Sequence, residues 1–219
     1  MIAAELISND MIPLRTSDTG RSALNVMSDF YVKHLPVVND KELLAIISEN
    51  DVLNNPIDEP LGSYPLKLNF PYAKQEDHLF EVMGLMAEHN LSVIPVVDDE
   101  KSYVGLISQE DLIQSYAKSF SFSEHGSIVV LEMLKSNYSL AEISGIVESE
   151  GAAILATFLN TAPSNQSVFV TLKINKQEIQ PILASFGRYE YRIKATYTES
   201  DYIDTLRDRY NSLIHYLNV

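Results

Sequence analysis

Hydrophobic positions in the first half of the chain follow one helical and two extended patterns, and this set occurs twice. Leu79, Met83 and Met86 stand four and three residues apart, which places one apolar face on a helix. Short apolar runs containing Pro-Val-Val follow at 34–38 and 93–97, and each leads through a polar turn into a second apolar run. The pattern predicts a helix and two strands, twice. The equivalent helical face in the first set consists of Leu24, Met27 and Tyr31.

The two sets form an internal repeat. His34–Val38 matches Val93–Val97 at an offset of 59 residues, and Ala45–Val52 matches Gly105–Leu112 at an offset of 60. The change of offset places one extra residue in the second turn. Self-similarity at a nearly constant offset predicts two copies of one structural unit.

In each copy the second apolar run leads into a serine that is followed three residues later by an aspartate. Ser48 and Ser108 stand where a helix N-cap is expected, and Asp51 and Asp111 fall in the first turn. The arrangement resembles a capping box in which Asp replaces Glu. A second helix is therefore expected after the strands of each copy.

The order of elements predicts an α+β fold in several parts. Residues 1–55 and 68–120 each read as a β-α-β-β-α unit, and 56–67, with three prolines, reads as a non-helical linker. From 127 to 198 the order is βαββαβ, ferredoxin-like in outline. Residues 201–217 predict a final helix that packs either on this sheet or in a dimer contact. Its apolar stripe consists of Tyr202, Leu206, Tyr210, Leu213 and Leu217.

Composition excludes several classes of protein. Lys and Arg number 16 and Asp and Glu number 30, so the net charge of −14 opposes nucleic-acid binding. Without cysteine there is no disulfide, no Cys-ligated zinc and no thiol nucleophile. No apolar run approaches the roughly 18 residues that span a bilayer, and the first residues do not resemble a secretory signal. We expect a cytoplasmic protein that binds neither nucleic acid nor membrane.

The sequence lacks the motifs of common enzymes. It contains no P-loop, no G-x-G-x-x-G, no G-x-S-x-G and no H-E-x-x-H, and its five histidines show no ligand spacing on one face. We therefore expect neither enzymatic activity, nor a metal site, nor a required cofactor.

The two copies resemble CBS domains, and the pair resembles a Bateman module, over residues 1–120. The Pro-Val-Val strands and the Ser-x-x-Asp turns carry this resemblance, because both motifs recur in fixed order at a fixed offset. The βαββαβ half resembles an ACT domain. The order of parts is similar to that of bacterial acetoin-utilisation-type CBS proteins, and the chain end from Arg209 looks like a bacterial subgroup of them.

CBS pairs bind AMP, ADP, ATP or S-adenosylmethionine, so the resemblance implies that Asp51 and Asp111 each hold a ribose. Ser48 and Ser108 would offer hydroxyl groups to an α-phosphate near helix N-termini, which favour anions. Bound ATP often brings magnesium. The residues implied to line the adenine slots are Leu14 and Ala73. From the residues alone an alternative remains, in which the serines only cap helices and the aspartates are solvated first-turn acids.

The copies differ at positions near the implied sites. Copy two has Gly105, where a backbone can approach a ligand closely, whereas copy one has Ala45. Copy one has His34 and Arg15, which could neutralise phosphate. We therefore hypothesise that a phosphate-rich nucleotide favours copy one and that S-adenosylmethionine suits copy two. His34 is equally compatible with a partly exposed surface histidine.

These observations predict a regulatory sensor that binds an adenosine ligand in the cleft of the CBS pair and forms a homodimer through the ACT-like half. One alternative is a scaffold with an empty cleft that regulates a partner enzyme. Another is an amino-acid-responsive ACT regulator. The turn at 136–140 lacks the glycine that amino-acid-binding ACT domains use, which favours a pairing role.

Overall fold

The computed structural model describes residues 1–8, 10–67, 69–119, 121–122, 124–162 and 166–198. The helix expected at 201–217 and its apolar stripe lie outside these residues. By its contacts the chain divides into two compact units, Met1–Tyr116 and Ala117–Val219.

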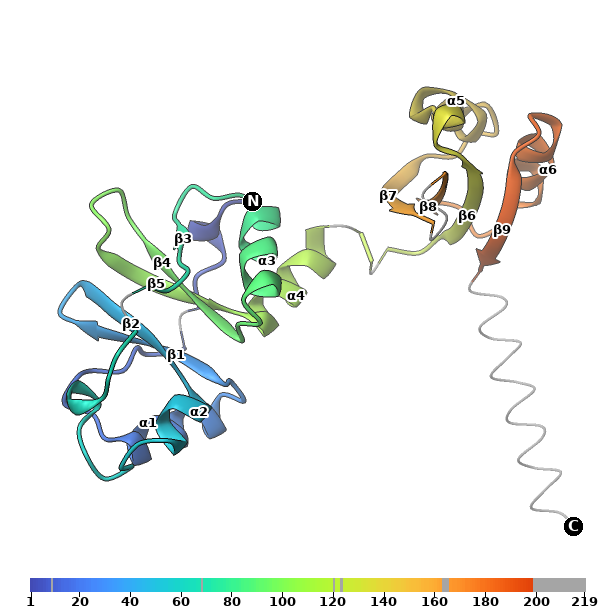
Figure 1. The fold of residues 1–219 in the computed structure, drawn as a ribbon. Helices are drawn as coiled ribbons and strands as arrows, with labels where there is room; N and C mark the ends of the chain where they lie inside the picture. The colour runs from blue at the N-terminus through green and yellow to red at the C-terminus, as the bar shows by residue number, and fades with distance from the viewer. Residues whose placement is uncertain (9, 68, 120, 123, 163–165, 199–219) are drawn as a thin grey trace, which may run out of the picture. The chain divides into compact units, whose positions relative to one another are not determined.

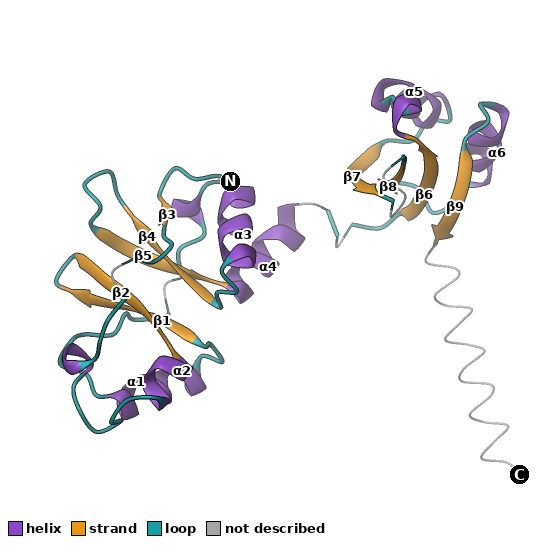
Figure 2. Ribbon diagram, viewed as in Figure 1, coloured by secondary structure: helices purple, strands orange, loops and turns teal. Residues whose placement is uncertain are grey.

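The first unit contains the two copies of the repeat (Figures 1 and 2). In copy one, strands β1 and β2 pair antiparallel, and in copy two strand β3 runs parallel to β4, which pairs antiparallel with β5. The elements of copy one are α1 (Gly20–Asp29), β1 (His34–Asn39), β2 (Glu42–Ser48) and α2 (Glu49–Leu53). Those of copy two are β3 (Ala73–Lys74), α3 (Leu79–Glu88), β4 (Val93–Val97), β5 (Tyr103–Ser108) and α4 (Gln109–Ser119).

The strand register confirms the repeat. His34 pairs with Ser48 in copy one, and Val93 pairs with Ser108 in copy two. Both hairpins also change register at the same place, after the first valine of the Pro-Val-Val motif. The tandem pair predicted from the sequence is therefore the fold of this unit.

The expected apolar face of the first helix is wrong at Tyr31. Helix α1 ends at Asp29, and Tyr31 has a positive φ of 53°. This left-handed residue turns the chain away from the helix axis, so its side chain is 95% exposed, whereas Met27 is buried.

Two segments outside the repeat pack where the sequence pattern did not place them. The first eight residues lie on copy two: Ala3 N–H donates to Asp77 O at 2.8 Å, and Ser8 N–H donates to Leu106 O at 2.9 Å. The stretch 56–67 has no α-helix but contains one short 3-10 turn, Leu61–Ser63, whose Leu61 is fully buried. Each segment therefore contributes two buried side chains to the first unit, Ala3 and Leu6 from the first and Leu61 and Tyr64 from the second.

The second unit has one four-stranded sheet in the order β7-β8-β6-β9, with all pairs antiparallel. Side chains of β8 alternate between buried and half-buried, and the buried set packs with Ile143, Val147 and Phe186 of the two helices. The βαββαβ order is confirmed, and the assignment of this unit as an ACT domain stays a prediction. Its elements are β6 (Ser127–Leu134), α5 (Leu140–Ser149), β7 (Ile154–Thr161), β8 (Ser167–Ile174), α6 (Gln180–Arg188) and β9 (Arg192–Tyr197).

Candidate functional site

Each copy holds an aspartate carboxylate in a fixed position at the start of its second helix. In copy one, Asp51 Oδ2 accepts from Ser48 N–H at 3.0 Å and from Ser48 Oγ at 2.5 Å, and Asp51 N–H donates back to Ser48 Oγ at 3.1 Å. Ser108 and Asp111 repeat these contacts at 3.2, 2.5 and 3.1 Å. The predicted capping box is thus confirmed in both copies. It engages one carboxylate oxygen, Oδ2, and immobilises the group.

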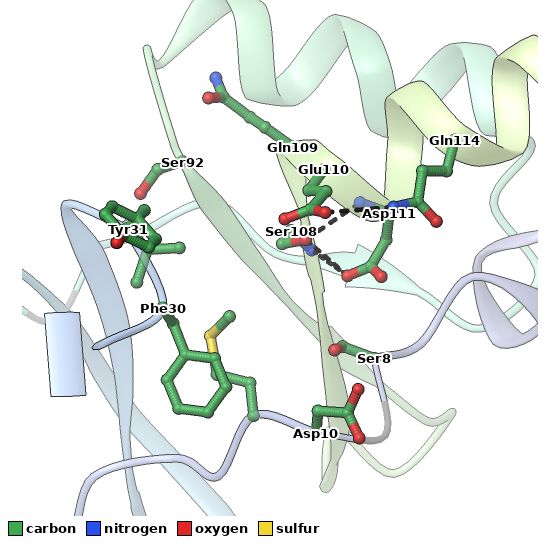
Figure 3. A pocket seen from close by; sticks show the side chains of 12 residues that line it. Ser8, Asp10, Phe30, Tyr31, Ser92, Ser108, Gln109, Glu110, Asp111 and Gln114 are labelled. Carbon is green, nitrogen blue, oxygen red and sulfur yellow. Dashed lines mark hydrogen bonds between the residues drawn. The ribbon is translucent and has the colours of Figure 1, made fainter. Parts of the chain in front are cut away.

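Asp111 lines a cavity of about 300 Å³, which we call the Asp111 cleft (Figure 3). Its walls come from the N-terminal segment, the residues after α1 in copy one, and, in copy two, Ser92 before β4 and the first two turns of α4. Three of the lining side chains are acidic and none is basic. The cleft is lined by Ser8, Asp10, Met11, Phe30, Tyr31, Val32, Ser92, Ser108, Gln109, Glu110, Asp111 and Gln114.

Asp51 lines two adjoining hollows of about 140 and 220 Å³, which share Ile46, Asp51 and Lys67 and which we call the Asp51 cleft. Unlike the Asp111 cleft, it contains a lysine and two histidines. The other lining residues are His34, Ile47, Ser48, Asn55, Tyr64, Pro65, Leu66, Asn69, Phe70, Pro71, His89 and Leu91.

Lys67 gives Asp51 a counter-charge. The Nζ atom of Lys67 lies 3.5 Å from Asp51 Oδ1, and the lysine side chain is 77% exposed. Burial acts to raise the pKa of Asp51, but the hydrogen bonds from Ser48 and the Lys67 ammonium outweigh it, so the pKa lies below its ordinary value. Asp51 is therefore ionised at neutral pH and available as a hydrogen-bond acceptor.

His34 connects the two copies through Ser92. Ser92 N–H donates to His34 Nδ1 at 3.2 Å, and the Ser92 Oγ accepts from His34 N–H at 3.0 Å. Burial lowers the pKa of His34 more than the nearby Asp51 raises it. The imidazole is therefore mostly neutral at pH 7, and the basic side chain that lies beside Asp51 is that of Lys67.

Four candidate residues lie outside the walls of both clefts as the described residues define them: Leu14 and Ala73, which the resemblance implied, and Arg15 and Gly105, which the comparison of the copies singled out. Leu14 and Ala73 are buried in the core. Each pairs in parallel with a valine of the Pro-Val-Val strand in its own copy, Leu14 with Val37 and Ala73 with Val96. Arg15 is exposed, and its backbone N–H donates to Asp18 in a turn. Gly105 faces Ile7, since a Cβ atom on it would stand 2.4 Å from Ile7 Cγ2.

Sequence reasoning missed the cross-copy walls of the clefts. Lys67 and His89 line the Asp51 cleft, and Phe30 and Tyr31 line the Asp111 cleft. The repeat could have indicated two of them. At the offset of 59, Phe30 corresponds to His89, so the two residues occupy the same position after the first helix of each copy. Each cleft therefore combines the Asp of one copy with the helix end of the other.

No helix within the described ranges is long and apolar enough to cross a membrane. Across the same residues, no group of three or more His, Asp or Glu side chains could hold a metal ion.

Comparison with known families finds a match within the first part of the chain. A profile of the CBS domain matches residues 3–58 and 62–118, more than half of the 219 residues. Inosine-5'-monophosphate dehydrogenase from Methanocaldococcus jannaschii is 29% identical over 113 residues, which are 51% of this chain and 23% of that enzyme. The chain thus spans less than a quarter of the enzyme's length.

Two solved structures are each similar to about half of the chain. A protein assigned to acetoin utilisation (AcuB) from Vibrio cholerae is 21% identical, with a TM-score of 0.49, over 56% of this chain and 95% of that one. The cytosolic domain of the Mg²⁺ channel MgtE, solved in complex with ATP, is 21% identical, with a TM-score of 0.44, over 52% of this chain and 48% of that one.

Proposed function

This chain belongs to the CBS-domain family, and from that premise we propose that it is a regulatory protein, not an enzyme, whose clefts bind adenosine-containing ligands. The ligands considered are AMP, ADP, ATP and S-adenosylmethionine. One observation carries the proposal: each copy fixes an aspartate carboxylate in a capping box at the wall of a cavity. A cytoplasmic location remains a prediction.

A ribose suits such a carboxylate. Two vicinal hydroxyl groups can donate to one carboxylate, and a hydrogen bond to a charged group contributes about 1.5–3 kcal/mol. The capping box leaves Oδ1 of Asp111 outside its three hydrogen bonds. Since the carboxylate is already ordered, sugar binding would lose little side-chain entropy.

The charges of the two clefts support different ligands. Lys67 in the Asp51 cleft would hold phosphate oxygens, so we assign AMP, ADP or ATP to this cleft. The Asp111 cleft, with Asp10 and Glu110 beside Asp111, would repel a phosphate. An uncharged nucleoside or the cationic S-adenosylmethionine suits it better.

Regulation would follow from differential binding. Both clefts are built from both copies, so a ligand that fits one arrangement of the copies better than another shifts their equilibrium. We propose that the unit at 127–198 forms the contact of a homodimer and that the signal acts on a partner enzyme. A scaffold whose clefts stay empty is the alternative.

A second candidate ligand is an amino acid bound by the βαββαβ unit. A cavity of about 430 Å³ lies where β6 ends and β9 begins, and its lining includes Glu132, Glu142 and Arg192. Groups of both charges could pair with the ammonium and the carboxylate of an amino acid. The amino-acid-responsive alternative rests on this cavity.

A thermal-shift screen of adenosine, AMP, ADP, ATP, S-adenosylmethionine and the common amino acids tests the proposal. At 100 times its Kd, a ligand that binds only the folded state stabilises it by about 2.7 kcal/mol. We expect shifts with adenosine compounds that are lost in Asp51→Ala or Asp111→Ala. Shifts with amino acids alone would favour the second candidate, and no shift with any compound would favour the scaffold.

A further inference from the structure

Tyr31 occupies a backbone position that does not suit it. Its φ of 53° lies in the left-handed region, which bulky residues rarely adopt. The corresponding position in copy two is Asn90, with a φ of 51°. Asn tolerates this conformation because its short side chain can hydrogen-bond locally. The same turn is therefore made twice, once with a suitable residue and once with a tyrosine.

Packing does not account for the tyrosine. Its side chain is 95% exposed, and its neighbour Phe30 is 38% exposed. Buried apolar contacts that would offset an unfavourable backbone conformation are thus missing at Tyr31 within the described structure. A strained residue kept without such contacts is a candidate for a role in function.

The surroundings of Tyr31 indicate what that role is. Phe30 and Tyr31 lie on one side of the Asp111 cleft, and Ser108, Glu110 and Asp111 lie on the other (Figure 3). The aromatic pair comes from copy one and the acidic group from copy two. A nucleoside has the matching division, with a planar base at one end and a ribose diol at the other.

We propose that Tyr31 is a ligand-binding residue that stacks on the base of a nucleoside whose ribose is held by Asp111. This inference rests on the function proposed above and adds the partner of the base. Aromatic side chains stack on any base. A phosphate in this cleft would face three acidic side chains and no basic one among the described lining residues. Together with the adenosine-containing ligands proposed above, this favours adenosine without a phosphate, or S-adenosylmethionine, as the ligand of the Asp111 cleft.

Such a ligand would bridge the two copies. Its base would contact the end of α1, and its ribose would contact the start of α4. Binding would then favour the arrangement of copies in which Tyr31 and Asp111 face each other across the cleft. The ligand would shift the equilibrium between arrangements because it binds this one more tightly.

The repeat itself supplies a variant that distinguishes the backbone strain at Tyr31 from the contact of its ring with the ligand. Tyr31→Asn introduces the residue that copy two uses at this position, so the turn is retained and its strain relieved. We expect the melting temperature to stay the same or rise, while the Kd for adenosine, measured by calorimetry, increases about tenfold. Tyr31→Phe keeps the ring and is expected to leave the Kd for adenosine within about twofold of the wild-type value.

A spectroscopic test uses the lack of tryptophan in this chain. Tyr31→Trp creates a single tryptophan, which can be excited apart from the tyrosines, and a stacked base is expected to quench its emission with saturation at the calorimetric Kd. Adding Asp111→Ala should abolish the quenching, whereas adding Asp51→Ala should not. The control is Tyr197→Trp, at a position on β9 that is 59% exposed, whose emission adenosine should leave unchanged.

The outcomes separate this inference from the function on which it rests. Binding of adenosine that depends on Asp111 but is unaffected by Tyr31→Asn, with no quenching in Tyr31→Trp, overturns the stacking role and leaves the ligand proposal standing. Binding that depends only on Asp51 also overturns the stacking role. If adenosine, AMP, ATP and S-adenosylmethionine all fail to bind the wild-type protein, both proposals are wrong.

Discussion

Asp51 and Asp111 share one local geometry and differ in the charge that faces them. Oδ1 of Asp51 lies 3.5 Å from Lys67 Nζ, while no basic side chain lines the Asp111 cleft as described. An exposed ion pair of this kind contributes little to stability. The ammonium is therefore free to exchange the carboxylate for a phosphate when a nucleotide enters.

Lys67→Gln is expected to weaken ATP binding to the Asp51 cleft by about tenfold, because a charge-assisted contact to phosphate is lost. Adenosine binding should not weaken, since we assign adenosine to the Asp111 cleft, which Lys67 does not line. Calorimetry with both ligands at two salt concentrations measures the effect, which should shrink at high salt. Lys74→Gln, a lysine outside both clefts, is the control. Equal ATP affinity in Lys67→Gln and wild type would show that Lys67 does not contact phosphate.

His34 makes the stability of the first unit depend on pH. Its pKa in the folded protein is below the ordinary 6.5, chiefly because burial disfavours the imidazolium. The unfolded chain then binds more protons between the two pKa values, so stability is fully present above pH 6.5 and falls as the pH drops through that value.

We expect the loss of melting temperature between about pH 7.5 and pH 5 to be larger in the wild type than in His34→Gln, which has no group to titrate at that position. Glutamine can also accept the Ser92 N–H through its side-chain oxygen, so the link between the copies is retained. Thermal melts over a pH series provide the measurement. A parallel pH dependence in both proteins would refute the role of His34.

The positions of some functional residues could be predicted from the sequence, and those of others could not. The Ser–Asp pairs were predictable, because a capping box is local and its spacing is fixed. Lys67 and Tyr31 were not, since their places depend on how one copy meets the other. Gly105 was predicted to admit a ligand, but its missing side chain makes room for Ile7.

Strand β5 and the N-terminal segment meet at this glycine. A Cβ atom at position 105 would stand 2.4 Å from Ile7 Cγ2, so Gly105→Ala is expected to cost about 1–3 kcal/mol of unfolding free energy. Ile7→Ala removes the clashing atom, and in the double variant the glycine substitution should cost much less. Denaturant titrations of the four proteins in this cycle provide the measurement. Additive losses would mean that Ile7 does not limit position 105.

Helices and strands were largely predictable from periodicity. The two hairpins and the βαββαβ order follow from local apolar patterns and turn residues, whereas the register change that both hairpins share was not predicted. The packing of residues 1–8 on copy two was not predictable, because a short segment with little periodicity carries no signal for its partner. In copy one the first strand is reduced to a single parallel bridge, Leu14 to Val37, for which the apolar pattern gives no indication.

The whole molecule combines a CBS pair with a βαββαβ unit, and the account of its function depends on the pair. Each cleft draws one wall from each copy, so ligand binding would act on the arrangement of the copies and not on one copy alone. This shared construction is what would make the pair a sensor, because a ligand shifts an equilibrium only through unequal affinity for its states.

Calorimetric titration of the wild type, Asp51→Ala, Asp111→Ala and the double variant with adenosine and with ATP tests the central claim most directly. We predict that Asp111→Ala removes the adenosine site, that Asp51→Ala removes the ATP site, and that the double variant binds neither ligand while still folding cooperatively. Unchanged binding in the double variant, or no heat with either ligand in the wild type, would contradict the claim that these carboxylates hold ribose.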